Sequence, residues 1–283
     1  MSRVEAPSPS LAEVWSTVEE LWPSTLAEPW DAIGPVTGDP EQTVKCIVLA
    51  VDPTLAVVDD ALERGADLLI THHPLLLRGV QSVAANTFKG QVVHRLIENR
   101  CGLLTAHTNG DCAIGGVSEV LIRSCGGQDS VPLVASAGGV EGEGLGRVGD
   151  LPRAMRLTEF AERVYSVLPS VAGGVRVAGD PDGLIRRVAV CGGAGDSLFD
   201  EVRDSGADVY VTADLRHHPA SEAREAAGGG RPYLVDVSHF ASEWLWLGAA
   251  AGVLHRSLQD QGFGVEIAVS GINTDPWDFI LTP

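Results

Sequence analysis

Leu69-Ile70-Thr71-His72-His73-Pro74 is the stretch of the sequence that decides the predicted fold. The apolar run from Asp67 to Thr71 predicts a buried strand, and the proline predicts where that strand ends. Ligands of open α/β sheets bind at the carboxyl ends of the strands. The two histidines therefore stand where an α/β protein would place metal ligands.

Apolar and amphipathic segments alternate on both sides of this stretch. A capping box of Ser10 and Glu13 predicts the start of a helix at Leu11. The predicted strands are 44–51, 67–71 and 102–106, and the predicted helices are 55–64, 88–100 and 116–124. This β-α-β-α order predicts an α/β fold with a largely parallel sheet.

The pattern repeats later in the chain. Residues 45–50 correspond to 187–191, residues 64–71 correspond to 205–212, and His-His-Pro occurs at 72–74 and at 217–219. We therefore predict two similar α/β lobes with a metal site in the cleft between them.

The predicted boundaries follow from this repeat. They are a flexible tail at 1–10, a first lobe at 11–128, a connection with smaller elements at 129–186 and a second lobe at 187–283. We expect a helix capped by Thr158 within the connection. A final helix at 239–260 is expected to pack near the first lobe.

Composition excludes several classes of protein. The chain has 283 residues, 45% of them hydrophobic, and a net charge of −18, which argues against a nucleic-acid surface or an anionic membrane as partner. No apolar run approaches the roughly 20 residues of a membrane span, and no signal-peptide pattern opens the chain, so we expect a cytoplasmic protein. The five cysteines include no CxxC pair and predict buried thiols rather than a disulfide framework.

Five residues have the chemistry of metal ligands. His72 and His73 end one strand, Asp111 follows another, and His239 and Glu243 stand one helical turn apart. Mixed nitrogen and oxygen ligands suit Zn, Fe, Mn or Ni, and five of them exceed the needs of one catalytic zinc. The sequence therefore predicts two divalent metal ions per chain.

Each of these residues also has a structural interpretation. One of the two adjacent histidines could be buried and the other exposed, Asp111 could stabilise a turn, and His239 and Glu243 could form a surface pair. The glycine-rich segment 192–195 could be a tight β-α turn, or its amides could hold an anion. The sequence alone leaves these alternatives open.

Three motifs together resemble the GTP cyclohydrolase 1 type 2 family, also called Nif-three-like, from about residue 11 to the C-terminus. They are His72-His73-Pro74, His107-Thr108-Asn109-x-Asp111-x-x-x-Gly115-Gly116 and Asp236-x-x-His239-x-x-x-Glu243. The resemblance implies two related lobes, a two-metal centre and a toroidal homohexamer. It also implies that His72, His73, Asp111, His239 and Glu243 are the ligands, with His218 near the site.

The sequence departs from the family pattern without losing a ligand. Gly110, Ser118, Ala213 and Arg216 replace the residues that are usual in the family at these positions. The short connection leaves no room for the extra domain that some members insert between the lobes.

The resemblance implies a metal-dependent hydrolase that acts on a nucleotide or related heterocycle through metal-activated water. An enzyme also needs a group that transfers protons, and His107 and His218 are the candidates for this catalytic role. The alternative is a non-enzymatic metal-binding ring that serves as a scaffold or binds a partner.

Overall fold

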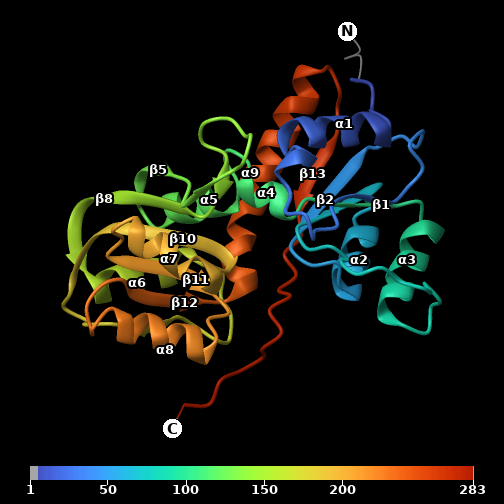
Figure 1. Cartoon of the computed structure of the whole chain (residues 1–283). Coiled ribbons are helices and arrows are strands. Elements are labelled where there is room, and N and C mark those ends of the chain that lie inside the picture. The colour runs from blue at the N-terminus through green and yellow to red at the C-terminus, as the bar shows by residue number, and fades with distance from the viewer. Residues whose placement is uncertain (1–5, 283) are drawn as a thin grey trace. The chain divides into compact units, whose positions relative to one another are not determined.

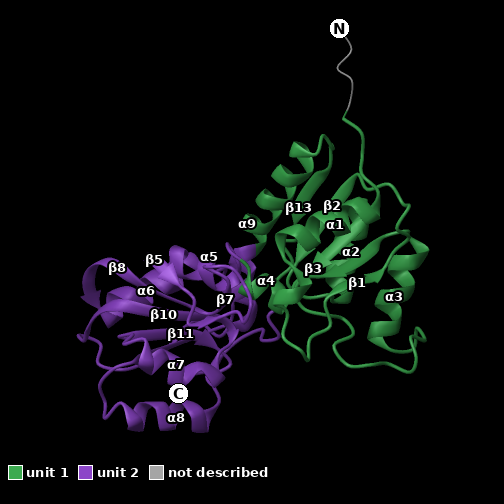
Figure 2. Cartoon of the chain, turned by 45° about the horizontal axis from the view of Figure 1, so that its top comes forward, with its two compact units in different colours: residues 1–113, 247–274 green, residues 114–246, 275–283 purple. Residues whose placement is uncertain are grey.

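The computed structural model describes residues 6–282 and has the mixed α/β fold that the sequence predicts. Its contacts divide the chain into two compact units (Figure 2). Unit 1 comprises Met1–Ala113 and Leu247–Thr274, and unit 2 comprises Ile114–Trp246 and Asp275–Pro283.

Unit 1 is built on a five-stranded sheet in the order β1-β4-β3-β2-β13 (Figure 1). Its strands are β1 Gly34–Thr37, β2 Cys46–Ala50, β3 Leu68–Thr71, β4 Gly102–Thr105 and β13 Glu266–Val269. The last four run parallel, and β1 pairs antiparallel with β4. Strands β2, β3 and β4 are buried along their whole length, as continuous apolar runs predict.

Helices cover both faces of this sheet. They are α1 Leu11–Leu21, the 3-10 turn η1 Ser24–Leu26, α2 Leu55–Glu63, α3 Phe88–Glu98, α4 Thr108–Cys112 and the second half of α9 His239–Asp260. Val48, Leu69 and Leu103 point to one face, where they form a core with α2 and α3. Helices α1 and α9 lie on the other side (Figure 1), where Gln261 donates to Thr17 of α1 over 3.1 Å.

Unit 2 is built on a six-stranded sheet in the order β5-β8-β10-β11-β12-β9. Its strands are β5 Gln128–Val131, β8 Arg147–Arg156, β9 Arg176–Ala178, β10 Leu184–Ala194, β11 Val209–Ala213 and β12 Tyr233–Val237. Only β10, β11 and β12 run parallel, whereas β5, β8 and β9 join the sheet antiparallel. A two-stranded ribbon of β6 Val134–Ala135 and β7 Gly144–Leu145 stands beside it.

Two groups of helices sandwich this second sheet. They are α5 Val117–Ser124, α6 Leu157–Val167, the 3-10 turn η2 Asp196–Leu198, α7 Phe199–Asp204 and α8 His217–Ala226. Val188 and Val190 pack against α5 and α6, while Ala189 and Cys191 pack against α7 and α8. This alternation is what a strand buried on both faces requires.

The two units differ from the predicted lobes, because the sequence predicted none of the antiparallel strands that extend each sheet. The range 129–186 was expected to be a connection, but β8 within it pairs with β10 over much of its length. The first unit ends at Ala113 rather than at residue 128, and β13 pairs with β2 instead of belonging to the second lobe. From Leu247 onward, α9 belongs to unit 1.

Several local predictions are confirmed, and two need correction. The capping box is present, with Glu13 accepting from the Ser10 amide over 2.7 Å. Thr158 does not cap α6, because the helix begins at Leu157 and the Thr158 hydroxyl donates to the Pro181 carbonyl over 2.8 Å. The segment after the predicted strand 102–106, expected to be a loop that carries Asp111, is instead the short helix α4.

The structure also bears on the predicted N-terminal tail, the cysteines and the membrane spans. Residues 1–5 of the predicted tail lie outside the described residues, whereas Pro9 is buried and its carbonyl accepts from the Val44 amide over 2.8 Å. All five cysteines are buried and reduced. Among the described residues, no helix is both long and apolar enough to cross a membrane.

Candidate metal centre

The carboxyl ends of three parallel strands bring polar residues together in unit 1. Thr71 of β3 pairs with Thr105 of β4, so His72 and Ala106 follow their strands at the same edge of the sheet. The Ala106 amide extends this ladder by donating to the Thr71 carbonyl over 2.9 Å. The pairing of neighbouring strands therefore places residues from distant parts of the sequence side by side.

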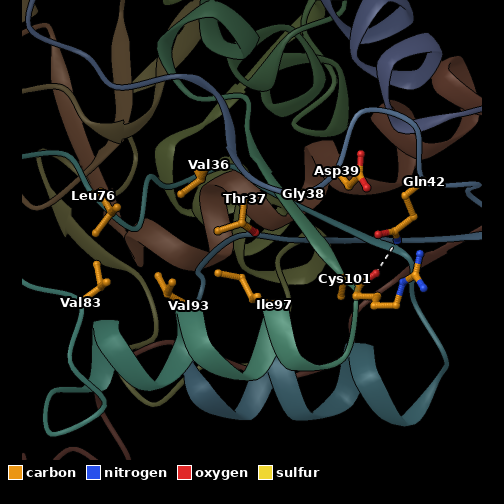
Figure 3. A pocket seen from close by; sticks show the side chains of 11 residues that line it. Val36, Thr37, Gly38, Asp39, Gln42, Leu76, Val83, Val93, Ile97 and Cys101 are labelled. Carbon is orange, nitrogen blue, oxygen red and sulfur yellow. Dashed lines mark hydrogen bonds between the residues drawn. The ribbon is translucent and has the colours of Figure 1, made fainter.

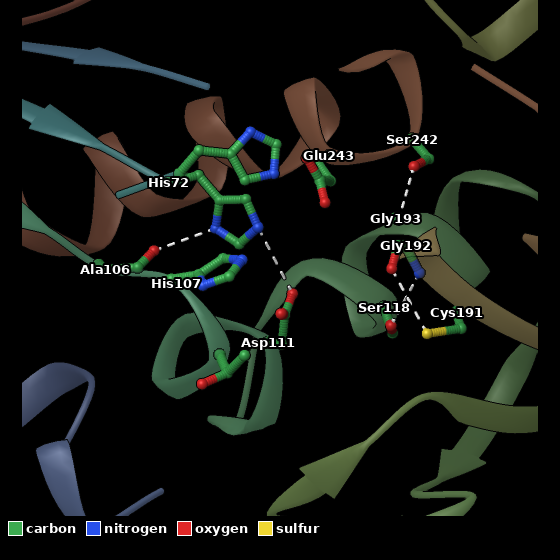
Figure 4. Close-up of polar contacts among 12 residues, drawn as sticks. His72, Ala106, His107, Asp111, Ser118, Cys191, Gly192, Gly193, Ser242 and Glu243 are labelled. Atoms are coloured by element: carbon green, nitrogen blue, oxygen red, sulfur yellow. Dashed lines mark hydrogen bonds and ion pairs between the residues drawn. The ribbon is translucent and has the colours of Figure 1, made fainter. Parts of the chain in front are cut away.

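His72 is buried and held in one orientation. Its Nδ1 lies 3.0 Å from the Ala106 carbonyl oxygen, an atom that can only accept, so Nδ1 carries the proton. Its Nε2 then lies 3.8 Å from Oδ1 of Asp111, which extends from α4 (Figure 4). Nε2 is thereby the ring atom that can bind a metal ion, and Asp111 lies beside it.

His73 and His107 are oriented in the same way by carboxylates. Nδ1 of His73 lies 2.7 Å from Oδ1 of Asp52, and Nδ1 of His107 lies 2.8 Å from Oδ1 of Asp31. An oxygen acceptor at Nδ1 fixes the tautomer that leaves Nε2 as the ligand atom. The sequence analysis did not identify Asp31 or Asp52, which are far from their histidines in the chain.

The three imidazoles form one group, which we call the histidine cluster (His72, His73 and His107). Their ring centroids are 5.1 to 5.5 Å apart, and one ligand nitrogen from each lies within 4.8 Å of the others. His73 is only 23% exposed, so neither of the adjacent histidines turns away to solvent. The predicted proton carrier His107 thus lies among the predicted ligands.

Burial and hydrogen bonds control the charges of Asp31 and His107. Burial alone would raise the pKa of Asp31, but hydrogen bonds from His107 and Thr108 outweigh it and lower the pKa below its usual range. Burial lowers the pKa of His107, and the neighbouring His72 lowers it further. His107 is therefore neutral at pH 7 and can bind a metal ion or accept a proton.

Unit 2 contains the other predicted ligands, the His239–Glu243 pair. Nε2 of His239 lies 2.9 Å from Oε1 of the buried Glu243, one turn further along α9. Nδ1 of His239 lies 2.7 Å from Oδ2 of Asp214, which follows β11 and has a φ of +54°. Asp214 thus orients His239 as Asp31 and Asp52 orient the other two, and its role was not predicted from the sequence.

The glycine-rich segment at 192–195 lies against this pair. The Gly193 amide donates to the Ser242 hydroxyl over 2.9 Å, and the Gly192 amide donates to the Ser118 hydroxyl over 3.1 Å (Figure 4). These amides are bonded within the protein, which favours the interpretation as a tight turn over that as an anion site. A Cβ on Gly193 would lie 2.5 Å from Oε1 of Glu243, so any other residue there would displace the Glu243 carboxylate.

His218, the second predicted proton carrier, lies on the first turn of α8 and is exposed. Its ring packs against that of the neighbouring His217, with centroids 5.1 Å apart. Among the described residues, it belongs to no group of converging metal-ligand atoms. His107 therefore lies within the histidine cluster, whereas His218 lies exposed at the start of α8.

Unit 1 also has a pocket of about 580 Å³ between β1 and α3. Figure 3 shows Val93 and Ile97 projecting from α3 toward Thr37 of β1. Its lining combines aliphatic and polar side chains and includes none of the predicted ligands. The pocket is thus separate from the histidine cluster.

The family model for Duf34/NIF3 (NGG1p interacting factor 3) matches residues 9–276. The chain belongs to this family. A relative from Streptomyces coelicolor, called "GTP cyclohydrolase 1 type 2 homolog", is 48% identical over 271 residues that cover 95% of this chain and 94% of the relative. These findings confirm the family that the motifs indicated.

Two further comparisons bear on the fold. A Bacillus cereus protein related to NIF3 has a solved structure that is 26% identical, with a TM-score of 0.86 over 99% of this chain and 100% of that chain. A Mycobacterium tuberculosis relative with the same printed name is 36% identical over 373 aligned positions, covering 95% of this chain and 96% of the relative. This alignment spans more positions than the 283 residues of this chain. The Mycobacterium tuberculosis relative therefore contains residues that have no counterpart in this chain.

We predict that Gly193→Ala disrupts the His239–Glu243 pair. The new Cβ would lie 2.5 Å from Oε1 of Glu243 and 3.1 Å from Nε2 of His239. Divalent-metal affinity should fall by at least about 10-fold, because the ligand atoms must move. Titration with Zn²⁺ against a chelating dye measures this.

Gly206→Ala is the matched control. Gly206 has a φ of +70°, close to the +68° of Gly193, but nothing lies within 4 Å of its Cβ position. Both variants bear the same backbone cost of about 1–2 kcal/mol, and only Gly193→Ala touches the ligands. Equal metal affinities in the two variants would contradict the prediction.

Proposed function

We propose that this Duf34/NIF3 protein is a metal-dependent hydrolase that binds two divalent ions and acts on a nucleotide or related heterocycle. One observation carries the proposal: four imidazoles each have Nδ1 within 3.0 Å of an oxygen acceptor, which is the orientation that makes Nε2 the ligand atom. Structural histidines have no need of this shared arrangement, whereas metal-binding histidines commonly have it.

The donor set suits the proposed ions. His72, His73, Asp111, His239 and Glu243 combine nitrogen and oxygen ligands, which favours Zn, Fe, Mn or Ni over Ca or Mg. His107 supplies a further nitrogen within the histidine cluster. Ions bound there would activate water and hold substrate oxygens.

The protein's own part in the reaction is to orient ligands and to transfer a proton. Neutral His107 can accept a proton at Nε2, and Asp31 at Nδ1 would stabilise the resulting imidazolium. The name of the relatives supports GTP or a similar nucleotide as substrate, with attack at an electrophilic carbon such as C8 of guanine. The first experiment is therefore an assay of the metal-loaded protein against a panel of nucleotides and small phosphoesters.

We predict that the purified protein contains up to two divalent ions per chain and that Asp111→Ala removes at least one of them. The Asp111 carboxylate lies 3.8 Å from Nε2 of His72, so its loss removes a ligand oxygen beside that nitrogen. Elemental analysis after metal loading measures this. Glu98→Ala is the control, because the Glu98 side chain is 72% exposed. A metal-free wild type, or a fully loaded Asp111→Ala, would refute the metal centre.

A second prediction separates His107 from His218. If His107 carries the proton, His107→Ala keeps the metal and lowers the rate by about 10²- to 10⁴-fold. If it is a ligand, the metal is lost as completely as in His239→Ala. His218→Ala should retain the metal, because the side chain is exposed and outside the cluster.

His94→Ala is the control for the loss of an exposed histidine, since its side chain is 49% exposed on α3. Metal content and rate are measured on the same samples. If His218→Ala and His94→Ala behave alike, His218 takes no part in catalysis. If His218→Ala empties the site, the assignment of the second set of ligands is wrong.

We further propose a homo-oligomer, a hexamer by the family resemblance. Large apolar side chains near the C-terminus support an interface, because monomers rarely expose several such neighbours. They are exposed by 58 to 85% and comprise Trp277, Phe279, Ile280 and Leu281.

We predict a mass several times the 29.7 kDa of one chain when the protein is measured by light scattering at micromolar concentration. Replacing Trp277 and Phe279 together by Ser should lower that mass, because both lie in the exposed segment. Tyr165→Ser is the control, since Tyr165 is 67% exposed on α6, outside that segment. A monomer in the wild type would exclude the assembly.

A further inference from the structure

We infer that Thr274 is a positioning residue that acts through Asp52 on the metal ligand His73; this inference rests on the proposed function. The Thr274 hydroxyl donates to Oδ2 of Asp52, and Oδ1 of the same carboxylate accepts from Nδ1 of His73 over 2.7 Å. All three residues belong to unit 1. A side chain 201 positions beyond His73 in the sequence thus contacts the carboxylate that holds the ring.

Asp52 needs this second contact because its surroundings leave it room to turn. Asp52 comes directly after Val51, just beyond the end of β2, and its side chain is 27% exposed. A carboxylate bonded at one oxygen can rotate about its side-chain torsion, and the ring bonded to it would move with it. A hydroxyl on the other oxygen fixes the carboxylate plane and hence the direction of Nε2.

The same arrangement occurs a second time in unit 1. Oδ1 of Asp31 accepts from His107 over 2.8 Å, and Oδ2 of Asp31 accepts from the Thr108 hydroxyl. Two Thr–Asp–His arrays therefore orient two members of the histidine cluster. His72 needs no such array, because the rigid backbone carbonyl of Ala106 holds it.

The segment that carries Thr274 is itself well anchored. The Ser270 amide donates to the Leu49 carbonyl over 2.8 Å, and the Ser270 hydroxyl donates to Oδ2 of Asp60 over 2.7 Å. These bonds fix the chain as it leaves β13 and passes the carboxyl end of β2. The segment after β13 thereby contributes to the orientation of a ligand.

The test compares three variants of the whole chain by Zn²⁺ titration. Thr274→Val keeps the shape but loses the hydroxyl, and it should weaken Zn²⁺ binding by about 10-fold. Thr274→Ser keeps the hydroxyl and should bind as the wild type does. Thr158→Val makes the same change in unit 2, where the lost hydroxyl bonds the Pro181 carbonyl and no predicted ligand, so its affinity should be unchanged.

A double-mutant cycle shows whether the effect passes through Asp52. In an Asp52→Ala background, Thr274→Val should cause no further loss of Zn²⁺ affinity. An equal loss in both backgrounds, or an equal loss in Thr158→Val, would overturn the inference.

The tautomer of His73 provides a readout that needs no metal. NMR of ¹⁵N-histidine-labelled, metal-free protein should show the Nδ1–H form in the wild type and in Thr274→Ser, and a mixture of tautomers in Thr274→Val. If the wild type binds no Zn²⁺ but this shift occurs, the proposed function fails while the positioning role of Thr274 stands. An unchanged tautomer together with an unchanged affinity overturns the inference.

Discussion

The site depends on one interaction, the hydrogen bond between Nδ1 of an imidazole and an oxygen acceptor. It occurs at His72, His73, His107 and His239, and in three of these cases the acceptor is a carboxylate. Burying a carboxylate beside an apolar core is costly unless its oxygens are bonded. At Asp31 the bonds from His107 and Thr108 more than offset that cost, as its lowered pKa indicates. The histidine and its partner therefore stabilise each other, and neither would keep its place without the other.

The sheets explain how such contacts form between distant residues. In unit 1, β2, β3 and β4 are parallel neighbours, so Asp52, His72 and Ala106 follow their strands at one edge. In unit 2, β10, β11 and β12 repeat this order, and Gly193, Asp214 and His239 stand at or just after the corresponding ends. The two units distribute the roles differently. In unit 1, Asp52, which orients His73, follows the first of the three strands. In unit 2, Asp214, which orients His239, follows the second.

The sequence predicted what local patterns encode. Strands that end in His72-His73 and a helix that carries His239 and Glu243 are visible in stretches of a few residues. The strand pairing of β8 was missed because its range contains a glycine, a proline and four charged residues and lacks a long apolar run. Asp31 and Thr274 could not be found, because nothing in their neighbourhoods predicts a contact across 76 or 222 positions of sequence. Residues that orient ligands are specified by the fold, whereas the ligands themselves are specified by motifs.

Charge links metal binding to the choice of substrate. The chain has a net charge of −18, and the proposed site adds Asp111 and Glu243 to the acidic partners of the histidines. Without cations, such a site would repel a nucleotide, because like charges in a partly buried site are weakly screened. Two divalent ions would offset most of that local charge and reverse the field at the point where a phosphate or a purine oxygen must bind. On the proposed function, the acidic partners would therefore have two roles: they orient the imidazoles, and they would make affinity for an anionic substrate depend on the bound metal.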